Sequence, residues 1–296
     1  MGASLSKQEN RLALPHTNPP HALLIEPLVR RALEEDMGRA GDITTDAIIP
    51  SGQIARANIA ARESGAVCGL IAADLAFRLI DPAIVLTPRL PDGSEVSKGD
   101  VIGALEGPAR AILTAERVAL NFMGHLSGVA TATHELVSHV AATKARIICT
   151  RKTIPGLRVL EKYAVRCGGG FNHRFGLDDA VLVKDNHIAA AGGIEPVVRA
   201  LRGRLGPMVK IEIEVDTLEQ LETALGLGIE AILLDNMPPE TMKRAVAMTK
   251  GRATLEASGG VTLERVRAIA ESGVDYISSG AITHSARNLD LGLDFL

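Results

Sequence analysis

The sequence predicts an α/β fold whose second half is a barrel of parallel strands. From Arg146 onward, apolar strand-like segments alternate with helical segments. Strands that are joined through helices run parallel, with right-handed crossovers. Nearly every strand-like segment also ends on a polar residue or a glycine. In a barrel these ends meet at one mouth, whereas a doubly wound open sheet would spread them along an edge, so the barrel is favoured.

The start of the chain predicts a leader followed by a helix. Residues 1–22 are expected to be a disordered leader. Its first residues, MGASLS, match the short myristoylation pattern with Gly2 and Ser6 in place, although this pattern often occurs by chance. Residues 23–37 carry leucines near helical spacing, which predicts an amphipathic helix.

Residues 54–107 predict short strands and tight turns. Short apolar stretches there are separated by turn-forming pairs such as Asp92-Gly93 and Gly107-Pro108. A long helix is predicted after them, roughly from Thr114 to Ala142.

Six strands and five helices are predicted in the second half. The strands are ARIICT, AVLVKD, VKIEIEV, EAILLDN, ATLEAS and DYISSG, and AVLV has the composition of a strand buried on both faces. The helices are GLRVLEKYAVRCG, EPVVRALRGRL, LEQLETALGLG, PETMKRAVAMTKG and TLERVRAIAESG. No G-x-G-x-x-G fingerprint follows a first strand, which disfavours a dinucleotide-binding sheet.

The composition of the 296 residues argues against several classes of partner. Aromatic residues make up 2% of the chain and Trp is absent, so stacking of nucleic-acid bases is not expected. The net charge is -3, which gives no general attraction to polyanions. No apolar run reaches the length of a membrane span. Cys68, Cys149 and Cys167 form no C-x-x-C, so we expect neither a disulfide framework nor a zinc site, and we expect a cytoplasmic location.

Five basic residues lie within a short stretch of a chain that is acidic overall. They are Arg151, Lys152, His173, Arg174 and Lys184. Solvated surface charge is the ordinary interpretation of such residues. Here three of them directly follow apolar strands, and like charges gathered at a barrel mouth repel unless a ligand neutralises them. We therefore expect an anion site, with one carboxylate held by the planar fork of an arginine.

Acidic residues follow the next two strands. Lys210, Glu212 and Glu214 share one face of a strand, and Glu214 lies nearest its carboxyl end. Glu212 is expected to lie deeper, paired with a cation of the core, and a buried salt-bridge layer of Lys210, Glu212 and Lys184 is the alternative interpretation. Asp235 ends the next strand. Glu214 and Asp235 could together bind sugar hydroxyls, or Mg²⁺ through water.

Glycines follow the last two predicted strands. Ser258, Gly259 and Gly260 precede a helix that begins near Thr262, and Gly280 follows the final strand. Ordinary turns are the alternative. Late barrel loops next to a helix N-terminus form phosphate sites from backbone N–H groups, and glycine allows the close approach.

Longer motifs give the sequence a resemblance to a known family. They are EDMGRAGDITT, ERVALNFMGHLSGVAT, TRKTIPGLRVLEKYAVRCGGGFNHRFGLDDAVLVKDNH, IEIEV, ILLDN, EASGG and GAITH. The sequence resembles the quinolinate phosphoribosyltransferases, or carboxylating nicotinate-nucleotide pyrophosphorylases. MGRAGD departs from many members, which have one residue fewer between Gly38 and Gly41.

The resemblance implies a two-domain fold. It implies an N-terminal sandwich-like α/β domain at residues 23–127, joined by the C-terminal tail 288–296. It also implies an incomplete, seven-stranded α/β barrel at residues 128–287. The strand missing from the six above is then expected around residues 128–145.

The resemblance also implies a reaction and the roles of residues. Members join quinolinate to phosphoribosyl pyrophosphate with Mg²⁺, and release pyrophosphate and CO₂ to give nicotinate mononucleotide for NAD biosynthesis. Arg151, Arg174 and Lys184 resemble the pocket for the quinolinate carboxylates, with Lys152 and His173 beside it. Glu214 and Asp235 resemble the partners of the ribose and of the metal-bound pyrophosphate. The resemblance places the phosphate at Ser258, Gly259, Gly260 and Gly280, with His284 nearby.

Arg117 resembles an arginine that is donated to the neighbouring subunit, which implies a homodimer or an assembly of dimers. Lys152, Lys184, Glu214 and Asp235 are the catalytic candidates. Three alternatives remain: a diverged phosphoribosyltransferase for another carboxylated ring, a Schiff-base enzyme that uses Lys184, and a non-enzymatic sensor of phosphoribosyl compounds.

Overall fold

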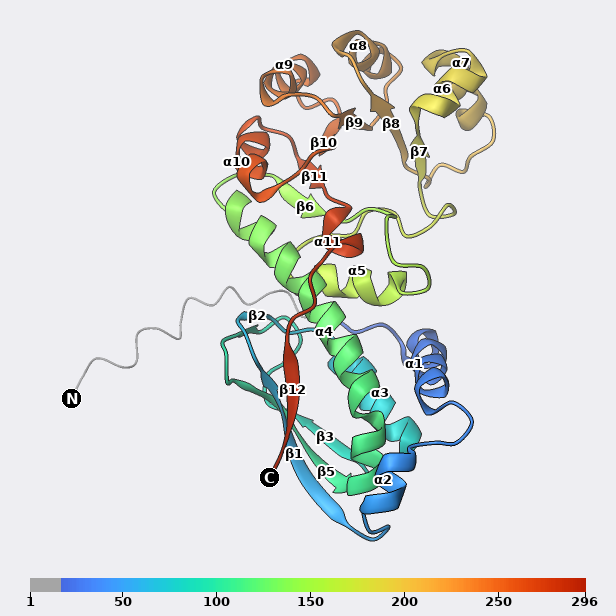
Figure 1. Cartoon of the computed structure of the whole chain (residues 1–296). Coiled ribbons are helices and arrows are strands. Elements are labelled where there is room, and N and C mark those ends of the chain that lie inside the picture. The colour runs from blue at the N-terminus through green and yellow to red at the C-terminus, as the bar shows by residue number, and fades with distance from the viewer. Residues whose placement is uncertain (1–16) are drawn as a thin grey trace, which may run out of the picture. The chain divides into compact units, whose positions relative to one another are not determined.

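The computed structural model describes residues 17–296, which belong to two compact units (Figure 1). Unit 1 comprises the chain up to Gly124 together with Asp290–Leu296, and unit 2 comprises His125–Leu289. The predicted leader falls largely on residues 1–16, which include Gly2 and Ser6 and lie outside the described residues.

Unit 1 is built on a four-stranded antiparallel sheet of order β12-β1-β5-β3. β12 (Leu291–Phe295), from the end of the chain, pairs with β1 (Ile54–Ala61). β5 (Val101–Pro108) pairs with β1 on its other side and with β3 (Val85–Pro88). Two short strands, β2 (Gly65–Ala66) and β4 (Glu95–Val96), pair with each other.

Three short or medium helices belong to unit 1. α1 (Ala22–Met37) confirms the helix predicted at residues 23–37, and it buries Ile25, Val29 and Leu33 at helical spacing. α2 (Ile43–Ile48) begins at Asp42, whose side chain accepts a hydrogen bond from the Thr45 N–H at 2.9 Å. The sequence interpretation contained no helix here.

α3 (Leu70–Ile80) corrects the prediction that residues 54–107 contain only strands and turns. Its sequence, LIAADLAFRLI, is apolar on most of its surface, so it shows no clear period of either kind. The helix buries Ala72, Ala73, Ala76 and Phe77. Small apolar residues of this kind permit close packing but carry little periodic signal.

α4 (Ala109–Val140) is the long helix predicted at residues 114–142, and the boundary between the units falls inside it. The expectation of a strand around residues 128–145 was wrong, because residues 128–140 are helical. In the part of the chain that the structure describes, no helix combines the length and apolar character that a membrane span needs.

Unit 2 contains a parallel sheet of six strands in the order β6-β11-β10-β9-β8-β7. The strands are β6 (Arg146–Ile148), β7 (Val181–Val183), β8 (Ile211–Val215), β9 (Ala231–Asp235), β10 (Thr254–Ser258) and β11 (Tyr276–Ser278). Each lies within one of the six predicted segments, and every neighbouring pair is parallel.

The predicted helices of unit 2 are confirmed as α5 (Arg158–Cys167), α7 (Ile194–Arg202), α8 (Leu218–Gly226), α9 (Pro239–Thr249) and α10 (Leu263–Glu271). Consecutive helices from α7 to α10 pack against one another, and Figure 1 shows α8 and α9 side by side beyond the ends of β8 and β9. Two shorter helices, α6 (Asp185–Ala191) and α11 (Ala281–His284), were not predicted.

The sheet of unit 2 is an incomplete barrel, because β6 and β7 do not pair with each other. Phe171 adds a single parallel bridge to Ile148 of β6, at the side where a further strand would continue the sheet. The guanidinium groups of Arg146 and Arg166 lie 4.8 and 4.7 Å from the centre of the Phe171 ring. The segment after Phe171 is therefore anchored beside β6 before the chain enters β7.

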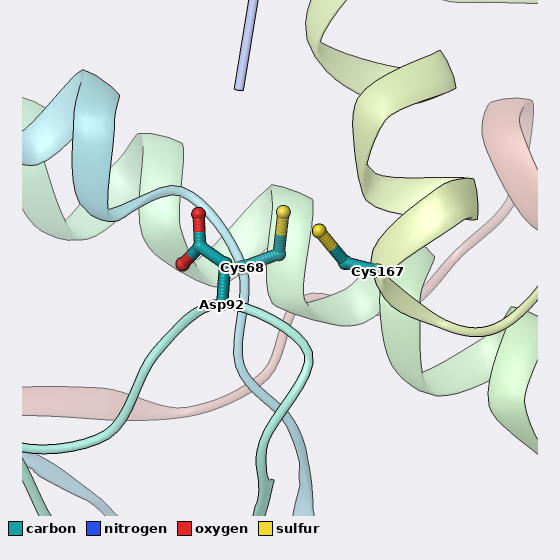
Figure 2. A group of neighbouring side chains, drawn as sticks. All are labelled: Cys68, Asp92 and Cys167. Carbon is teal, nitrogen blue, oxygen red and sulfur yellow. The ribbon is translucent and has the colours of Figure 1, made fainter. Parts of the chain in front are cut away.

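The three cysteines are buried thiols. Cys68 precedes α3 in unit 1, and the nearby Asp92 carboxylate accepts a hydrogen bond from the N–H of Leu70, the first residue of α3, at 3.2 Å (Figure 2). Cys167, also drawn in Figure 2, is the last residue of α5 in unit 2. Cys149 follows β6, and its thiol donates to the Asn172 side chain at 3.4 Å.

Candidate active site

The carboxyl ends of the unit 2 strands surround a cavity of about 700 Å³. Its wall includes every predicted site residue except Arg117: Arg151, Lys152, His173, Arg174, Lys184, Glu214, Asp235, Ser258, Gly259, Gly260, Gly280 and His284. Arg117 has an exposed side chain on the part of α4 that belongs to unit 1. The polar strand ends, the basic stretch and the family resemblance therefore pointed to one connected cavity.

Two arginines in this wall are incompletely hydrogen-bonded. Arg174 donates through one terminal nitrogen to the Ala180 carbonyl at 3.0 Å. The Nε groups of Arg151 and Arg174 are buried and have no hydrogen-bond partner among the described residues. Burial lowers the pKa of Arg174, and the charge of Arg151 lowers it further. An anion in the cavity would satisfy both donors and relieve the repulsion between the two guanidinium groups.

The lysines of the cavity are more exposed. Lys184 directly follows β7, and its backbone N–H donates to His187 Nδ1 at 2.9 Å. Only Val183 of the AVLV segment is buried, so the prediction of a strand buried on both faces was wrong. The cause is that β7 is an edge strand of the open sheet. Lys184 is thus exposed to solvent, but it lies in the cavity wall.

Lys152 is positioned by Gly280 and α11, which follow β11. Its carbonyl oxygen accepts a hydrogen bond from the Thr283 hydroxyl at 2.7 Å. A Cβ atom built on Gly280 would lie 2.9 Å from the Lys152 side chain. A larger residue at position 280 would therefore displace this lysine.

Two carboxylates lie on neighbouring strands in the same wall. Glu214 belongs to β8 and Asp235 ends β9. Burial raises the pKa of Glu214, the negative charge of Asp235 raises it further, and the charge of Lys184 opposes both effects. The two acids are therefore close enough to interact, and a cation between or near them would stabilise both charged forms.

The glycine-rich loop after β10 is held by a residue that sequence reasoning missed. Asn236 has a φ of 51°, unusual for a residue with a side chain, and its N–H donates to the Ser258 carbonyl at 2.9 Å. Its side-chain amide donates to Asp235 at 2.8 Å. Gly259 has a φ of 93°, and a Cβ there would collide with the Asn236 side chain. The Asp-Asn pair that follows ILL was the available signal for this link.

A second residue that sequence reasoning missed, Glu256, lies in the wall of the same cavity. His173 Nε2 is 2.9 Å from a Glu212 carboxylate oxygen and 3.5 Å from a Glu256 carboxylate oxygen. Glu212 is thus deep and paired, as predicted, but its partner is His173. No ion pair joins Glu212 to Lys210 or Lys184 within residues 17–296, so the alternative salt-bridge layer was wrong. Glu256 precedes Ser258 by two positions, and this strand period could have revealed it.

Both halves of the chain match known family models. The model described as the C-terminal domain of quinolinate phosphoribosyl transferase matches residues 129–294. The model described as the N-terminal domain of the same enzyme matches residues 42–127.

Individual relatives match over almost their whole length. The probable nicotinate-nucleotide pyrophosphorylase (carboxylating) of Bacillus subtilis is 44% identical over 92% of this chain and 93% of that protein. The Mycobacterium leprae enzyme of that name is 45% identical over 90% of this chain and 95% of its own. The structure of the nicotinate-nucleotide pyrophosphorylase from Francisella tularensis aligns with a TM-score of 0.90 at 40% identity, over 95% of this chain and 99% of that one. On this evidence, the chain belongs to the quinolinate phosphoribosyltransferase family.

Proposed function

We propose that the cavity of unit 2 is where this quinolinate phosphoribosyltransferase, an enzyme of NAD biosynthesis, binds quinolinate and phosphoribosyl pyrophosphate. The observation that carries the proposal is the pair of buried, unsatisfied Nε groups of Arg151 and Arg174 in the wall of one cavity. Two such donors beside each other require an anion with more than one negative group. Quinolinate, with two adjacent carboxylates on a planar ring, meets that requirement.

In this proposal the cationic wall fixes the orientation of the pyridine ring. Arg151 and Arg174 bind the carboxylates through their forks, while Lys152 and Lys184 add point charges from the more exposed side of the cavity. Holding the ring nitrogen in line with the anomeric carbon of the ribose would make the attack effectively unimolecular.

The acids and the glycine loops are proposed to bind the second substrate. Glu214 and Asp235 bind the ribose hydroxyls, and Ser258, Gly259, Gly260 and Gly280 hold the phosphate, with His284 at the rim. The ring nitrogen forms a bond to the anomeric carbon as the bond to pyrophosphate breaks, and positive charge develops on the ribose. The nearby carboxylates stabilise that charge.

Decarboxylation follows from the new charge on the ring. The quaternary nitrogen withdraws electrons, so the carboxylate next to it can leave as CO₂ while its bonding electrons stay on the ring carbon. A proton then takes up those electrons, and nicotinate mononucleotide results. Lys152 and Lys184 are the catalytic candidates on this side, since they neutralise charge near the bond that breaks.

Mg²⁺ is part of the proposal. The donor set fits this ion, because the charge of Asp235 raises the pKa of Glu214, and a hard cation with oxygen ligands would relieve the repulsion between them. Glu214 and Asp235 would hold it indirectly, through water or pyrophosphate. When bound, Mg²⁺ would neutralise charge on the departing pyrophosphate.

A homodimer, or an assembly of dimers, in which Arg117 enters the neighbouring subunit's site is also proposed. Its exposure on α4 supports this role. A cytoplasmic location is proposed as well, which the buried thiols of the three cysteines support.

The direct test mixes the purified chain with quinolinate, phosphoribosyl pyrophosphate and Mg²⁺, and measures nicotinate mononucleotide and CO₂. Arg174→Ala should raise the KM for quinolinate by roughly 10- to 100-fold, the effect of losing a charged hydrogen bond, with a much smaller change for phosphoribosyl pyrophosphate. Equal losses for both substrates would contradict the assignment of Arg174. If wild-type protein released no pyrophosphate with any pyridine carboxylate, or if borohydride trapped a carbonyl substrate on Lys184, the proposed reaction would be wrong.

A further inference from the structure

Two residues other than glycine have a positive φ in the part of the chain that the structure describes. They are Asn236 and Lys250, each with a φ of 51°. Lys250 ends α9, a position where the left-handed conformation is common. Asn236 instead follows β9 directly and lies in the wall of the cavity. A left-handed residue at such a place is held by its surroundings, and residues of this kind gather at functional sites.

The contacts of Asn236 join the end of β9 to the glycine loop of Ser258, Gly259 and Gly260. Its N–H donates to the Ser258 carbonyl at 2.9 Å, and its Nδ2 donates to Asp235 Oδ2 at 2.8 Å. Its amide oxygen lies against Gly259, because a Cβ atom built on that glycine would collide with Asn236 Oδ1. One side chain therefore restrains the rotation of the Asp235 carboxylate and also packs against the glycine loop.

The other end of the glycine loop is held independently of Asn236. Arg265 of α10 donates through a terminal nitrogen to the Gly260 carbonyl at 2.9 Å. A Cβ atom on Gly260 would meet this guanidinium group, and not Asn236. The loop is thus attached to β9 at Gly259 and to α10 at Gly260, and the attachment at Gly259 is the one that includes an acid of the cavity wall.

We infer that Asn236 is a positioning residue, which sets the distance between the Asp235 carboxylate and the glycine loop. The inference rests on the proposed function, in which Asp235 binds ribose hydroxyls and the loop binds the phosphate. In phosphoribosyl pyrophosphate these groups belong to one sugar, so the distance between their binding sites has to match the substrate. A residue that contacts both sites fixes that distance before the substrate arrives.

The charge of the wall favours an amide at this position. Glu214 lies close enough to Asp235 for the charge of Asp235 to raise the pKa of Glu214. A neutral amide donates to Asp235 without adding a third negative charge beside a phosphorylated substrate. Asn236→Asp keeps the size of the side chain and tolerance of a positive φ, but it removes the N–H donor and adds that charge. It should therefore weaken binding of phosphoribosyl pyrophosphate more than Asn236→Gly does.

The first test compares the two substrates in steady-state kinetics of the full chain. Asn236→Gly removes the side chain, and glycine adopts a φ of 51° without strain. The KM for phosphoribosyl pyrophosphate should rise roughly tenfold, the effect of losing a hydrogen bond to a charged group, while the KM for quinolinate stays within about twofold of wild type. An equal rise for both substrates would indicate general loosening of the site and would overturn the inference.

Lys250→Gly is the matched control for this test. It makes the same replacement at the same φ, on an exposed residue that is not part of the cavity wall. Both KM values should stay at the wild-type level. If Lys250→Gly changed the KM for phosphoribosyl pyrophosphate as much as Asn236→Gly does, the effect would come from the backbone and a positioning role of the amide would be wrong.

The second test examines the contact with Gly259 without turnover. Calorimetry measures the Kd of phosphoribosyl pyrophosphate with Mg²⁺ and phthalate, which has the two adjacent carboxylates of quinolinate but no ring nitrogen to react. Gly259→Ala should weaken binding at least about threefold less in the Asn236→Gly background than in wild type, because the obstacle to its Cβ is gone. Gly260→Ala, whose Cβ meets Arg265, should have the same effect in both backgrounds. Equal effects of Gly259→Ala in both would contradict the contact.

The outcomes separate this inference from the proposed function. If the wild-type chain neither bound phosphoribosyl pyrophosphate nor converted it, the proposed function would be wrong and the inference would fall with it. If wild type bound and converted this substrate, but Asn236→Gly and Asn236→Asp left its KM unchanged, the inference alone would be wrong.

Discussion

At the scale of single residues, Glu256 illustrates how position in a strand decides the charge of a side chain. It is 4% exposed, lies on β10 two residues before Ser258, and belongs to the wall of the cavity. Burial raises its pKa well above the ordinary value, and the negative charge of Glu212 raises it further. We interpret Glu256 as a neutral acid in the wall of the cavity, next to Glu212.

The neutral state of Glu256 leads to a prediction about how the free energy of unfolding depends on pH. Below the ordinary glutamate pKa of about 4.3, Glu256 is protonated in both the folded and the unfolded chain. As the pH rises, the unfolded chain ionises first, so the folded state loses stability by up to about 1.4 kcal/mol per pH unit until Glu256 also ionises in the folded state. Glu256→Gln removes this penalty and should be more stable than wild type at pH 7, with a smaller difference near pH 4.5.

Urea unfolding at the two pH values would measure this difference. Glu240→Gln, at an exposed residue of α9, is the control, and it should change stability little at either pH. An advantage of Glu256→Gln that is equal at both pH values would mean that the ionised carboxylate is tolerated in the fold.

At the scale of elements, α5 holds the two loops that carry the arginines of the cavity. Arg158 donates through Nε to the Thr153 hydroxyl at 3.1 Å and through a terminal nitrogen to the Phe175 carbonyl at 3.1 Å. Glu161, with no exposed surface, accepts hydrogen bonds from the Ile154 N–H at 3.1 Å and from His125 at 2.9 Å. One helix thus fixes the segment after Arg151 and the segment after Arg174 relative to each other.

This geometry predicts that Arg158→Met disturbs quinolinate binding without touching the substrate. Losing two hydrogen bonds from a charged group should loosen both loops and raise the KM for quinolinate by roughly tenfold. The matched control is Arg199→Met on α7, where the arginine is exposed and its ion pair among residues 17–296 is with Glu195 on its own helix. Steady-state kinetics of the two variants would test the prediction, and equal behaviour of both would contradict it.

The elements that the sequence predicted are those with a clear period or a clear end. The six strands of unit 2 are short apolar runs between amphipathic helices, and their polar or glycine carboxyl ends marked most of the predicted residues of the cavity wall, while His173 and Arg174 came from the basic stretch between two strands and His284 from the family resemblance. α3 escaped prediction because an apolar run of that length fits a helix or buried strands equally well. Asn236 and Glu256 escaped because the signals for them, an Asp-Asn pair and a strand period, are weak alone, and their contacts with neighbouring strands appear only in the fold.

At the scale of the whole molecule, the remaining question is how a residue of unit 1 could complete a site in unit 2. Arg117 has an exposed side chain on α4 and is not among the residues that line the described cavity. A symmetric dimer places the same surface of each subunit against the other, so a residue given to the neighbour is also received from it. Arg117 would then act only in the neighbouring subunit's site.

Mixed dimers distinguish this arrangement from action within one chain. Arg117→Ala and Arg174→Ala are produced together with two different tags, and only dimers that carry both tags are assayed. If Arg117 acts across the interface, the site in the Arg117→Ala subunit keeps its own Arg174 and receives an intact Arg117 from the neighbouring subunit. The other site carries both substitutions, so the mixed dimer should have about half of wild-type activity. A mixed dimer of Arg174→Ala and Lys184→Ala should stay inactive, because both residues belong to unit 2 and each site keeps one defect. Failure of the first pair to regain activity would show that Arg117 serves its own chain or none.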